Sequence, residues 1–406
     1  MTDTRGALII GGGIAGPVTA MALRKAGIEA TVYEAYQHAA DGVGGGLGIA
    51  PNGQTALAAI GAGDIPRSIG TPMKAMVIES WTGKRLAEFG SPPELPVMQF
   101  VWRSELYRSL YDEAAARGIA IEHGKRFVGF DETADGIVAH FDDGSSASGD
   151  VLIGADGLRS AVRGVIDPNA PAPRYGGLLS FGGRLRDLEL APTGGNMHMQ
   201  FGKRAFFGYQ VEQDGTGGWF CNLPSREMVS LEKMRRTSPE EWLRVMIAAA
   251  ADDRGPVSGL LRRTDPAELL VVGPMEDLPK VPVWSRGRAV LVGDSAHATS
   301  PSSGQGASLA MESAVQLARC LRDLPHHEAF AEYERLRRAR CERIIAMGAR
   351  TNQNKAAGPV GRVIRDAVMP PLMRTLAKPE KLAWQYDYPI DWDAPVRGGG
   401  AVGAAA

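Results

Sequence analysis

A glycine-rich turn near the start of the chain is the feature that most restricts its fold. Residues 7–10 (ALII) form a short apolar run that ends in glycine, as a buried parallel strand does. Residues 14–22 then place apolar side chains at helical spacing, and Pro17 lies in the first turn, where a missing N–H costs least. Residues 30–34 (ATVYE) have the pattern of a second strand. Together these segments predict a βαβ unit within a parallel α/β sheet.

The glycines of this turn and the acid after the second strand have separate roles. Gly11 permits the tight turn, Gly13 lets the backbone approach a pyrophosphate, and Gly16 lets the helix pack closely on the strand. Glu34 ends the second strand, where a carboxylate can accept hydrogen bonds from ribose hydroxyls. We therefore predict a Rossmann-like site for FAD or NAD. The alternative is a glycine-rich loop followed by a surface acid.

A second strand, turn and helix occur late in the chain and favour FAD. Residues 289–294 (AVLVGD) form a buried strand that ends in an acid, and a helix is predicted from Gly306. Asp294 can bind a polyol hydroxyl, and the helix N-terminus can stabilise negative charge. Since a reduced flavin is an anion, such a helix end favours a flavin. Between these two motifs, residues 151–157 (VLIGADG) add a further apolar strand and turn.

With these three motifs in order, the sequence resembles the class A flavin monooxygenases, the para-hydroxybenzoate hydroxylase family. It is especially similar to single-component members such as the salicylate and 3-hydroxybenzoate hydroxylases, from about Ala7 to about Trp392. The resemblance implies an α/β fold, α+β overall, in which a Rossmann-like FAD-binding domain is interleaved with an antiparallel-sheet substrate domain and followed by C-terminal helices. It also implies a hydroxylase that uses NADH or NADPH and dioxygen, through a flavin hydroperoxide, on an aromatic or polycyclic small molecule.

The resemblance also implies which residues contact FAD. The first motif and Glu34 would hold the ADP half, Asp294 the ribityl chain, and Arg103 the phosphate or ribityl side. A glycine-rich run, residues 42–53, would lie beside the flavin ring, as would the turn before the late helix. The full set is Gly11, Gly13, Ile14, Ala15, Gly16, Glu34, Gly45, Gly46, Arg103, Phe127, Asp156, Asp294, Pro301, Gly304, Gln305, Gly306 and Ala307. No catalytic acid or base is assigned, and His297 is interpreted as structural.

The pattern changes between about residue 175 and residue 277, where short apolar runs separated by turns predict antiparallel strands. The resemblance implies that this sheet covers the flavin. The substrate candidates on its inward face are Phe206, Tyr209, Trp219 and Asn222. No charged residue stands out as a partner for a substrate carboxylate, so a large apolar or polycyclic substrate is expected.

These changes of pattern divide the chain into segments. The predicted FAD-binding parts are 1–73, 97–177 and 275–345, and the predicted substrate parts are a hairpin at 74–96 and a sheet at 178–274. A C-terminal helical segment at 346–393 is expected to wrap back on the flavin domain. The tail, 394–406, is rich in glycine and alanine and is expected to be disordered.

Composition limits the partners. The formal net charge is −1, which gives no reason to expect nucleic acid, and no apolar run is long enough for stable membrane insertion. Three cysteines form no zinc or redox spacing, so a reduced cytoplasmic protein without a metal is expected, as a monomer or homodimer. Arginines from Arg335 to Arg343 alternate with Glu334 and Glu342, and we interpret them as a solvated helix face.

Three other functions fit the same motifs. One is epoxidation or Baeyer–Villiger insertion, and a second is an oxygen-independent flavin reductase or dehydrogenase. The third is a flavin carrier without catalysis. Incorporation of labelled dioxygen into product separates an oxygenase from the second, and NAD(P)H oxidation separates it from the third.

Overall fold

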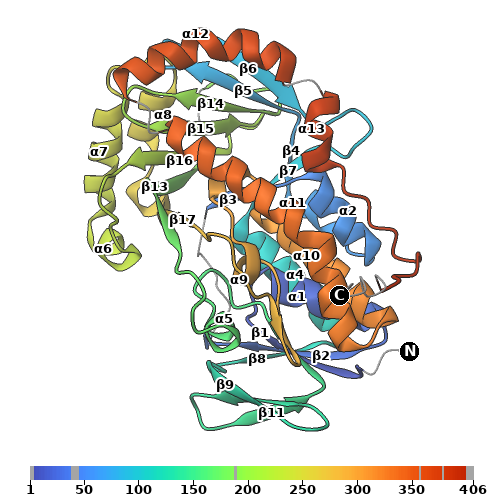
Figure 1. The fold of residues 1–406 in the computed structure, drawn as a ribbon. Coiled ribbons are helices and arrows are strands. Elements are labelled where there is room, and N and C mark those ends of the chain that lie inside the picture. Colours follow the sequence, from blue (N-terminus) through green and yellow to red (C-terminus); the bar gives the residue numbers. More distant parts are fainter. Residues whose placement is uncertain (1–3, 38–44, 187–189, 356–357, 377–378, 399–406) are drawn as a thin grey trace, which may run out of the picture.

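The computed structural model describes residues 4–37, 45–186, 190–355, 358–376 and 379–398, and two large sheets form its framework (Figure 1). The first sheet has the order β18-β19-β12-β1-β2-β8. Its strands are β1 (Gly6–Ile10), β2 (Glu29–Glu34), β8 (Ala120–His123), β12 (Val151–Gly154), β18 (Ser285–Arg286) and β19 (Ala289–Leu291). All neighbouring pairs are parallel except β18 with β19. The predicted parallel α/β sheet is therefore confirmed.

Helices cover this sheet because its strands are apolar on both faces. Ile9 pairs with Ile153 on one side and with Val32 on the other, and all three are fully buried. The strands and helices share one large core. Its helices include α1 (Ala15–Lys25), α2 (Pro51–Ala59), α4 (Arg103–Ala116), α5 (Ala161–Ile166), α10 (Gly306–Asp323) and α11 (His326–Lys355).

Two small sheets flank the first sheet. One contains β9 (Phe127–Glu132), β10 (Ile137–Phe141) and β11 (Ser146–Gly149); the other contains β3 (Gly46–Ile49), β4 (Thr71–Met73) and β7 (Met98–Trp102). Three short helical segments lie in connections: α3 (Ile65–Ile69) between α2 and β4, and α9 (Asp294–His297) and the 3-10 turn η2 (Pro301–Ser303) between β19 and α10. Residues 42–44 of the predicted glycine-rich loop lie outside the described residues.

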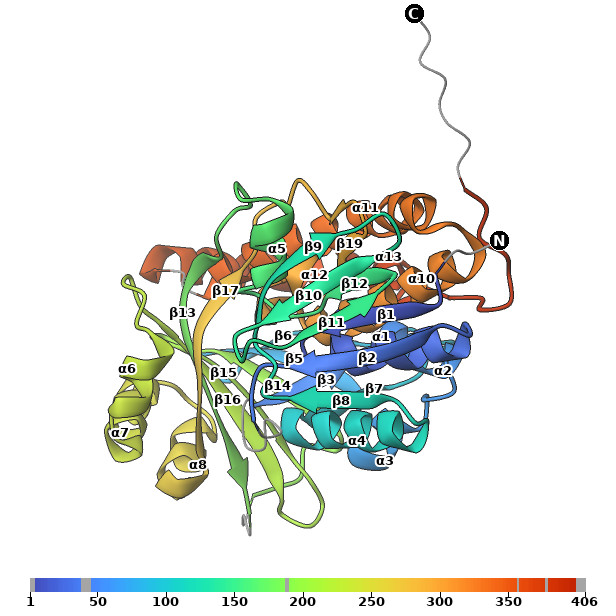
Figure 2. The ribbon, with the colours of Figure 1, turned by 90° about the horizontal axis from the view of Figure 1, so that it is seen from below.

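The second large sheet has the order β17-β13-β16-β15-β14-β5-β6. Its strands are β5 (Ala75–Ser80), β6 (Arg85–Gly90), β13 (Arg174–Leu185), β14 (Asn196–Phe201), β15 (Phe206–Val211), β16 (Gly217–Pro224) and β17 (Leu269–Asp277). Every neighbouring pair is antiparallel except β14 with β5, so the predicted antiparallel sheet is present. Figure 2 shows α6 (Leu231–Arg236), α7 (Pro239–Ala250) and α8 (Val257–Arg263) on its outer side; η1 (Pro266–Glu268) precedes β17.

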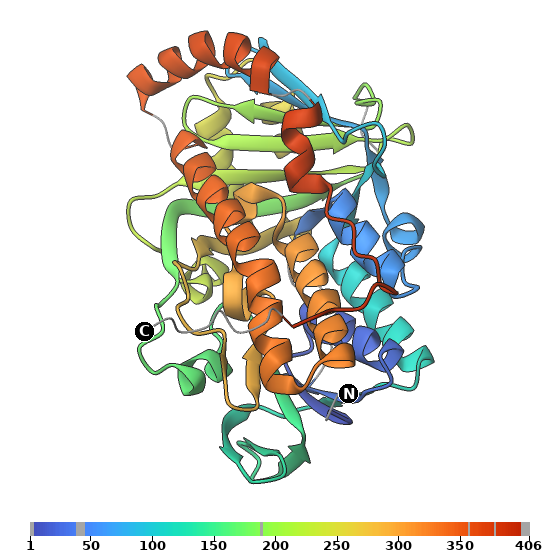
Figure 3. The ribbon, with the colours of Figure 1, turned by 45° about the vertical axis from the view of Figure 1, so that its right-hand side comes forward.

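The C-terminal segment returns to the first sheet's helices, as the sequence predicted. After α12 (Pro359–Leu376) and α13 (Pro379–Tyr386), the chain runs back along α10 and α11 (Figure 3). Trp392 lies in the large core, beneath the side chains of Lys25 and Arg322. The expectation of a disordered tail is wrong for its first residues, because Ala394 and Val396 are hydrogen-bonded to α10. Residues 399–406 lie outside the described residues.

The described residues add three observations on the expected partners. None of the helices in this part of the chain is both long and apolar enough to cross a membrane. Within the same residues, no group of three metal-ligating side chains comes together. Cys221, Cys320 and Cys341 are free and buried, and burial raises the pKa of all three thiols.

Candidate functional site

The three sequence motifs meet at the carboxyl ends of neighbouring strands, β1, β12 and β19. Gly11 follows β1 with φ +106°, and a Cβ there would lie 2.5 Å from the backbone oxygen of Ala155, which follows β12. Gly293 follows β19 with φ +65°, and a Cβ there would lie 2.9 Å from the Cβ of Ala15 at the start of α1. Only glycine permits these approaches. The edge where they meet is where parallel sheets bind ligands.

Glu34 lies beside the first glycine turn. Its carboxylate accepts hydrogen bonds from the backbone N–H of Gly12 at 2.7 Å and of Tyr36 at 2.9 Å. The region around Gly13 is open, since a Cβ added there would meet no atom within 4 Å. A nearby residue that sequence reasoning missed is Tyr111 of α4, whose hydroxyl lies over Gly12; burial and Tyr107 raise the pKa of Tyr111. The charge and open space match the needs of an ADP group.

Asp294 and Arg103 are brought together although they are far apart in sequence. Asp294 begins α9 and is accessible to solvent, yet burial among surrounding protein atoms raises the pKa of its carboxyl. The side chain is therefore surrounded by protein atoms and still open to a ligand. The charges of His297 and Arg103 oppose this rise in the pKa of Asp294. The Arg103 guanidinium therefore lies close enough to interact electrostatically with the Asp294 carboxylate. An accessible carboxylate in these surroundings can accept hydrogen bonds from a polyol.

The turn before α10 is shaped for a ligand. Gly304 is in the left-handed region, at φ +64°, is exposed, and has no atom within 4 Å of an added Cβ. Gln305 is buried, and its side-chain oxygen accepts a hydrogen bond from Asn52 at 3.0 Å. Thr299 and Ser302, in the same turn, each have a buried hydroxyl that finds no hydrogen-bond partner among the described residues. Buried polar atoms of this kind call for a partner that the chain alone does not supply.

The remaining candidates surround this turn. Gly45, Gly46, Gly306 and Ala307 are partly or fully accessible, and the oxygen of Gly45 accepts the backbone N–H of Arg103 at 3.2 Å. Pro301 begins η2 and is exposed. Phe127, by contrast, has its side chain in the core, so only its backbone is available to a ligand.

The middle motif connects to the late motif through Ser295. Asp156 accepts hydrogen bonds from the hydroxyls of Ser160 and Ser295 and from the backbone N–H of Val162 at 3.1 Å. Arg163 donates to the backbone oxygen of Ser295 at 2.9 Å. Asp156 therefore fixes the start of α5 against α9 in this structure.

His297 has structural surroundings, in keeping with its interpretation from the sequence. It is buried, packs near Trp284, and its Nε2 lies 2.9 Å from the hydroxyl of Ser313. Burial and the neighbouring Arg337 lower the pKa of its imidazole to about 4. A histidine that stays neutral at pH 7 and is enclosed in this way does not act as an accessible base.

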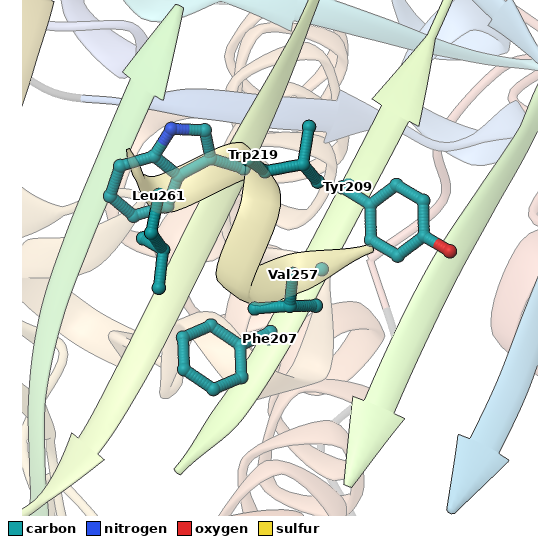
Figure 4. Close-up of a pocket in the computed structure, with 7 residues that line it drawn as sticks. Phe207, Tyr209, Trp219, Val257 and Leu261 are labelled. Atoms are coloured by element: carbon teal, nitrogen blue, oxygen red, sulfur yellow. The ribbon is translucent and has the colours of Figure 1, made fainter. Parts of the chain in front are cut away.

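The four substrate candidates lie on two faces of the second sheet. Phe206 pairs with Asn222, whereas Tyr209 pairs with Trp219, and an odd separation along each strand puts the two pairs on opposite faces. Tyr209 and Trp219 pack toward α8 around a cavity of about 10 Å³, which holds one water molecule at most (Figure 4). The interpretation of Tyr209 and Trp219 as substrate contacts is therefore wrong, because they belong to the core under α8.

Replacement of Trp219 tests this correction. Its indole N–H donates to the hydroxyl of Thr264 at 2.9 Å, and both residues are buried. Trp219→Phe should lower the free energy of unfolding by about 1–3 kcal/mol, because the oxygen of the buried hydroxyl loses its N–H donor and keeps only its own bond to the backbone oxygen of Leu260. Urea unfolding measures this change. The KM for an accepted substrate should stay within about twofold of wild type; a much larger rise would restore Trp219 to the substrate site.

The opposite face of the sheet, here called the inner face, meets β7. A Cβ at Gly218 would lie 3.0 Å from Trp102, and one at Gly208 would lie 2.1 Å from Phe220. Phe100, Met199 and Phe220 form an apolar cluster here and are each only partly buried. The inner face, with Phe206 and Asn222, is thus the side that faces β7.

Lys355 is the charged residue that sequence reasoning missed at the inner face. It ends α11, and its Nζ donates to the side-chain oxygen of Asn222 at 2.7 Å. Sequence reasoning found no charged partner for a substrate carboxylate, and the structure now places the side-chain nitrogen of Lys355 against the inner face. Nothing in the sequence around Lys355 signals this position, because it depends on where the end of a long helix meets the sheet.

The arginines of α11 also differ from the prediction. Arg337 is fully buried against the carboxylate of Glu312 at 2.5 Å, and Arg340 contacts the same carboxylate at 2.8 Å. The interpretation of Arg335 to Arg343 as a solvated face is wrong for these two. Burial alone would raise the pKa of Glu312, but the two arginines hold it below its ordinary value.

Comparison with known proteins agrees with this geometry. A family model described as "FAD binding domain" matches residues 4–176 and 281–347. The FAD-dependent urate hydroxylase of Klebsiella pneumoniae is 32% identical over 346 residues, 83% of this chain and 86% of the relative. The 3-amino-4-hydroxybenzoate 2-monooxygenase PtmB3 of Streptomyces platensis is 30% identical over 410 residues, 94% and 95%. The structure of Klebsiella pneumoniae HpxO with FAD and uric acid superposes with a TM-score of 0.82 at 26% identity, over 95% of this chain and 98% of that one.

Proposed function

Because this chain belongs to the FAD binding domain family of FAD-dependent hydroxylases and monooxygenases, we propose that it transfers one oxygen atom of dioxygen to a planar aromatic small molecule. As a member of that family it is an FAD-dependent monooxygenase, and NADH or NADPH is the typical co-substrate. The observation that carries the proposal is the meeting of the three glycine motifs beside the accessible Asp294, opposite the apolar inner face.

Residues at the carboxyl ends of the first sheet's strands would hold FAD. The N-terminus of α1 at Gly13 would bind the pyrophosphate. Glu34 would accept a hydrogen bond from a ribose hydroxyl, using a carboxylate lone pair that the N–H groups of Gly12 and Tyr36 do not occupy. Asp294 would accept hydrogen bonds from the ribityl chain. The unpartnered hydroxyls of Thr299 and Ser302 lie in the turn that would face the flavin ring. When bound and reduced, FAD supplies the activation of dioxygen.

The residues of the second sheet would place the substrate and exclude water. Phe100, Met199 and Phe220 offer a flat apolar surface, on which an aromatic ring gains contact area. The named relatives act on urate and on 3-amino-4-hydroxybenzoate, which are planar rings with polar substituents. A substrate of that shape fits between the inner face and the turn before α10. Holding the reacting carbon in position and keeping out water are the protein's contributions to such a reaction.

The test is a substrate screen with labelled oxygen. Purified protein loaded with FAD should oxidise NADH or NADPH at least tenfold faster when a suitable phenol, purine or hydroxyquinoline is present. The product should contain one atom from ¹⁸O₂. Product formed without the label would indicate a reductase or dehydrogenase. Bound FAD without any stimulated NAD(P)H oxidation, whatever the compound, would refute the proposed function.

A further inference from the structure

The ammonium of Lys355 lies over aromatic rings on the inner face. Its Nζ is 4.1 Å from the ring centre of Phe206 and 5.8 Å from that of Phe220. Asn222 accepts one of its N–H groups at 2.7 Å. The amide of Asn222 is itself oriented, because its NH₂ group donates to the hydroxyl of Ser180 at 3.2 Å. The lysine is therefore held at a defined place, and the hydrogen bond to Asn222 uses only one of its N–H groups.

Within the described residues, no carboxylate forms an ion pair with Lys355. Three charged side chains on neighbouring elements have partners of their own: Arg184 of β13 pairs with Glu105, Arg365 of α12 with Asp366, and Arg362 donates to the backbone oxygen of Lys203. Burial alone lowers the pKa of Lys355 to about 7. Desolvating an amine without an acid nearby is costly, so such a lysine is expected to serve a ligand.

Helix α11 fixes Lys355 next to the turn that would face the flavin. Asn352, one turn before Lys355, accepts the hydroxyl of Ser300 at 2.9 Å. Gly348, one turn earlier, packs so closely on the same segment that a Cβ would lie 3.0 Å from the hydroxyl of Thr299. The lysine therefore lies between that turn and the inner face, and its side chain is half-buried and within reach of a ligand.

We propose that Lys355, positioned by Asn222, binds an ionised oxygen on the substrate ring. This inference rests on the proposed function and narrows its substrate class to rings with an acidic hydroxyl, such as phenols, enols and hydroxylated nitrogen heterocycles. The neutral amine takes the proton of the hydroxyl: the O–H bond breaks, an N–H bond forms, and an ammonium and an oxyanion remain. The oxyanion donates electron density into the ring, which makes the ortho and para carbons better acceptors of an electrophilic oxygen.

The experiment compares hydroxyl compounds with their methyl ethers, which cannot ionise. The probes are 2-naphthol, 4-hydroxyquinoline and 3-hydroxybenzoate, each beside its O-methyl ether. Perturbation of flavin absorbance gives Kd for wild type, Lys355→Met and Lys203→Met, all with FAD bound. Lys203 is the matched control, because its Nζ lies 4.2 Å above the ring of Trp81. Wild type should bind at least one hydroxyl compound tenfold more tightly than its ether; Lys355→Met should lose that preference, and Lys203→Met should keep it.

Two further measurements separate the possible failures. Lys355→Arg keeps the charge but cannot accept the proton, so it should bind 3-hydroxybenzoate while losing at least tenfold in turnover. Trinitrobenzenesulfonate at pH 8 should modify Lys355 before Lys203, as located by mass spectrometry; an unmodified Lys355 would overturn the proposal. An unchanged hydroxyl preference in Lys355→Met, with normal FAD content and NAD(P)H oxidation, would overturn it and leave the proposed function intact. If no compound of the full substrate screen stimulates NAD(P)H oxidation, the proposed function fails, and this inference with it.

Discussion

Asp294→Ala is expected to purify almost colourless. Asp294 is the accessible carboxylate at the edge where the three motifs meet, and Arg103 is its cationic neighbour. A hydrogen bond to a charged group contributes about 1.5–3 kcal/mol, so the loss of one such bond weakens FAD binding by about 10- to 150-fold. The ratio of flavin absorbance to protein absorbance after gel filtration measures the result.

The controls for Asp294 separate loss of binding from loss of fold. Asp143→Ala removes a surface carboxylate that pairs with Lys125 at 2.8 Å, and it should remain fully yellow. Asp294→Asn keeps the shape and one acceptor oxygen and should retain an intermediate amount of FAD. The apo form of Asp294→Ala should show the far-ultraviolet circular dichroism of wild type. Normal FAD content in Asp294→Ala would refute the role of Asp294.

The meeting of the three motifs could be predicted because it follows from local rules. Each motif comes directly after an apolar strand, and parallel strands end at a common edge, so Gly11, Asp156 and Asp294 were expected near one another. The late strand, turn and helix favoured FAD as the cofactor, and the family resemblance added the order of the segments. Tertiary packing was not needed for either step.

The faces of the second sheet were predictable in part, but the prediction was wrong. Strand residues alternate between the two faces of a sheet. Phe206 and Tyr209 are an odd number of positions apart, so they could not lie on the same face. Aromatic character was given more weight than this alternation. The roles of Lys355 and Arg337 had no such signal, because both depend on what the long helix α11 packs against. A charged helical pattern looks the same whether its partner is water or a buried acid on another helix.

Glu312→Gln is expected to destabilise the fold more than any of the other substitutions. Glu312 is fully buried on α10, and it compensates Arg337, which is also fully buried, and Arg340, which is 11% exposed. Removing one partner of a buried ion pair leaves uncompensated charge and costs about 3–5 kcal/mol. Glu232→Gln is the control: Glu232 is 74% exposed and its partner Arg236 is 78% exposed, so a loss below about 1 kcal/mol is expected. Urea unfolding measures both.

A second comparison tests the origin of this cost. Arg337→Met leaves Glu312 paired with Arg340, so it should lower the free energy of unfolding by less than Glu312→Gln does. The double variant, which combines Glu312→Gln with Arg337→Met, should be more stable than Glu312→Gln alone. Because the pKa of Glu312 is lowered in the folded state, its stabilisation is complete above the ordinary value of 4.5. It is lost as the pH falls below that value, and the Glu312→Gln variant should lack this part of the acid dependence. Equal stability of Glu312→Gln and Glu232→Gln would contradict the argument.

The same substitution should also affect the cofactor, because Glu312 connects to the flavin-facing turn. Asn52 donates both to Glu312 and to Gln305, the residue before α10. On the other side, Arg337 and Arg340 lie 4.6 and 4.7 Å from the ring of Tyr388 in the C-terminal segment. Loss of the Glu312 charge should therefore loosen both the turn and that segment. Glu312→Gln is expected to release FAD at a lower urea concentration than wild type, before global unfolding, as followed by recovery of flavin fluorescence. Release that coincides with unfolding would mean that the network supports the fold alone.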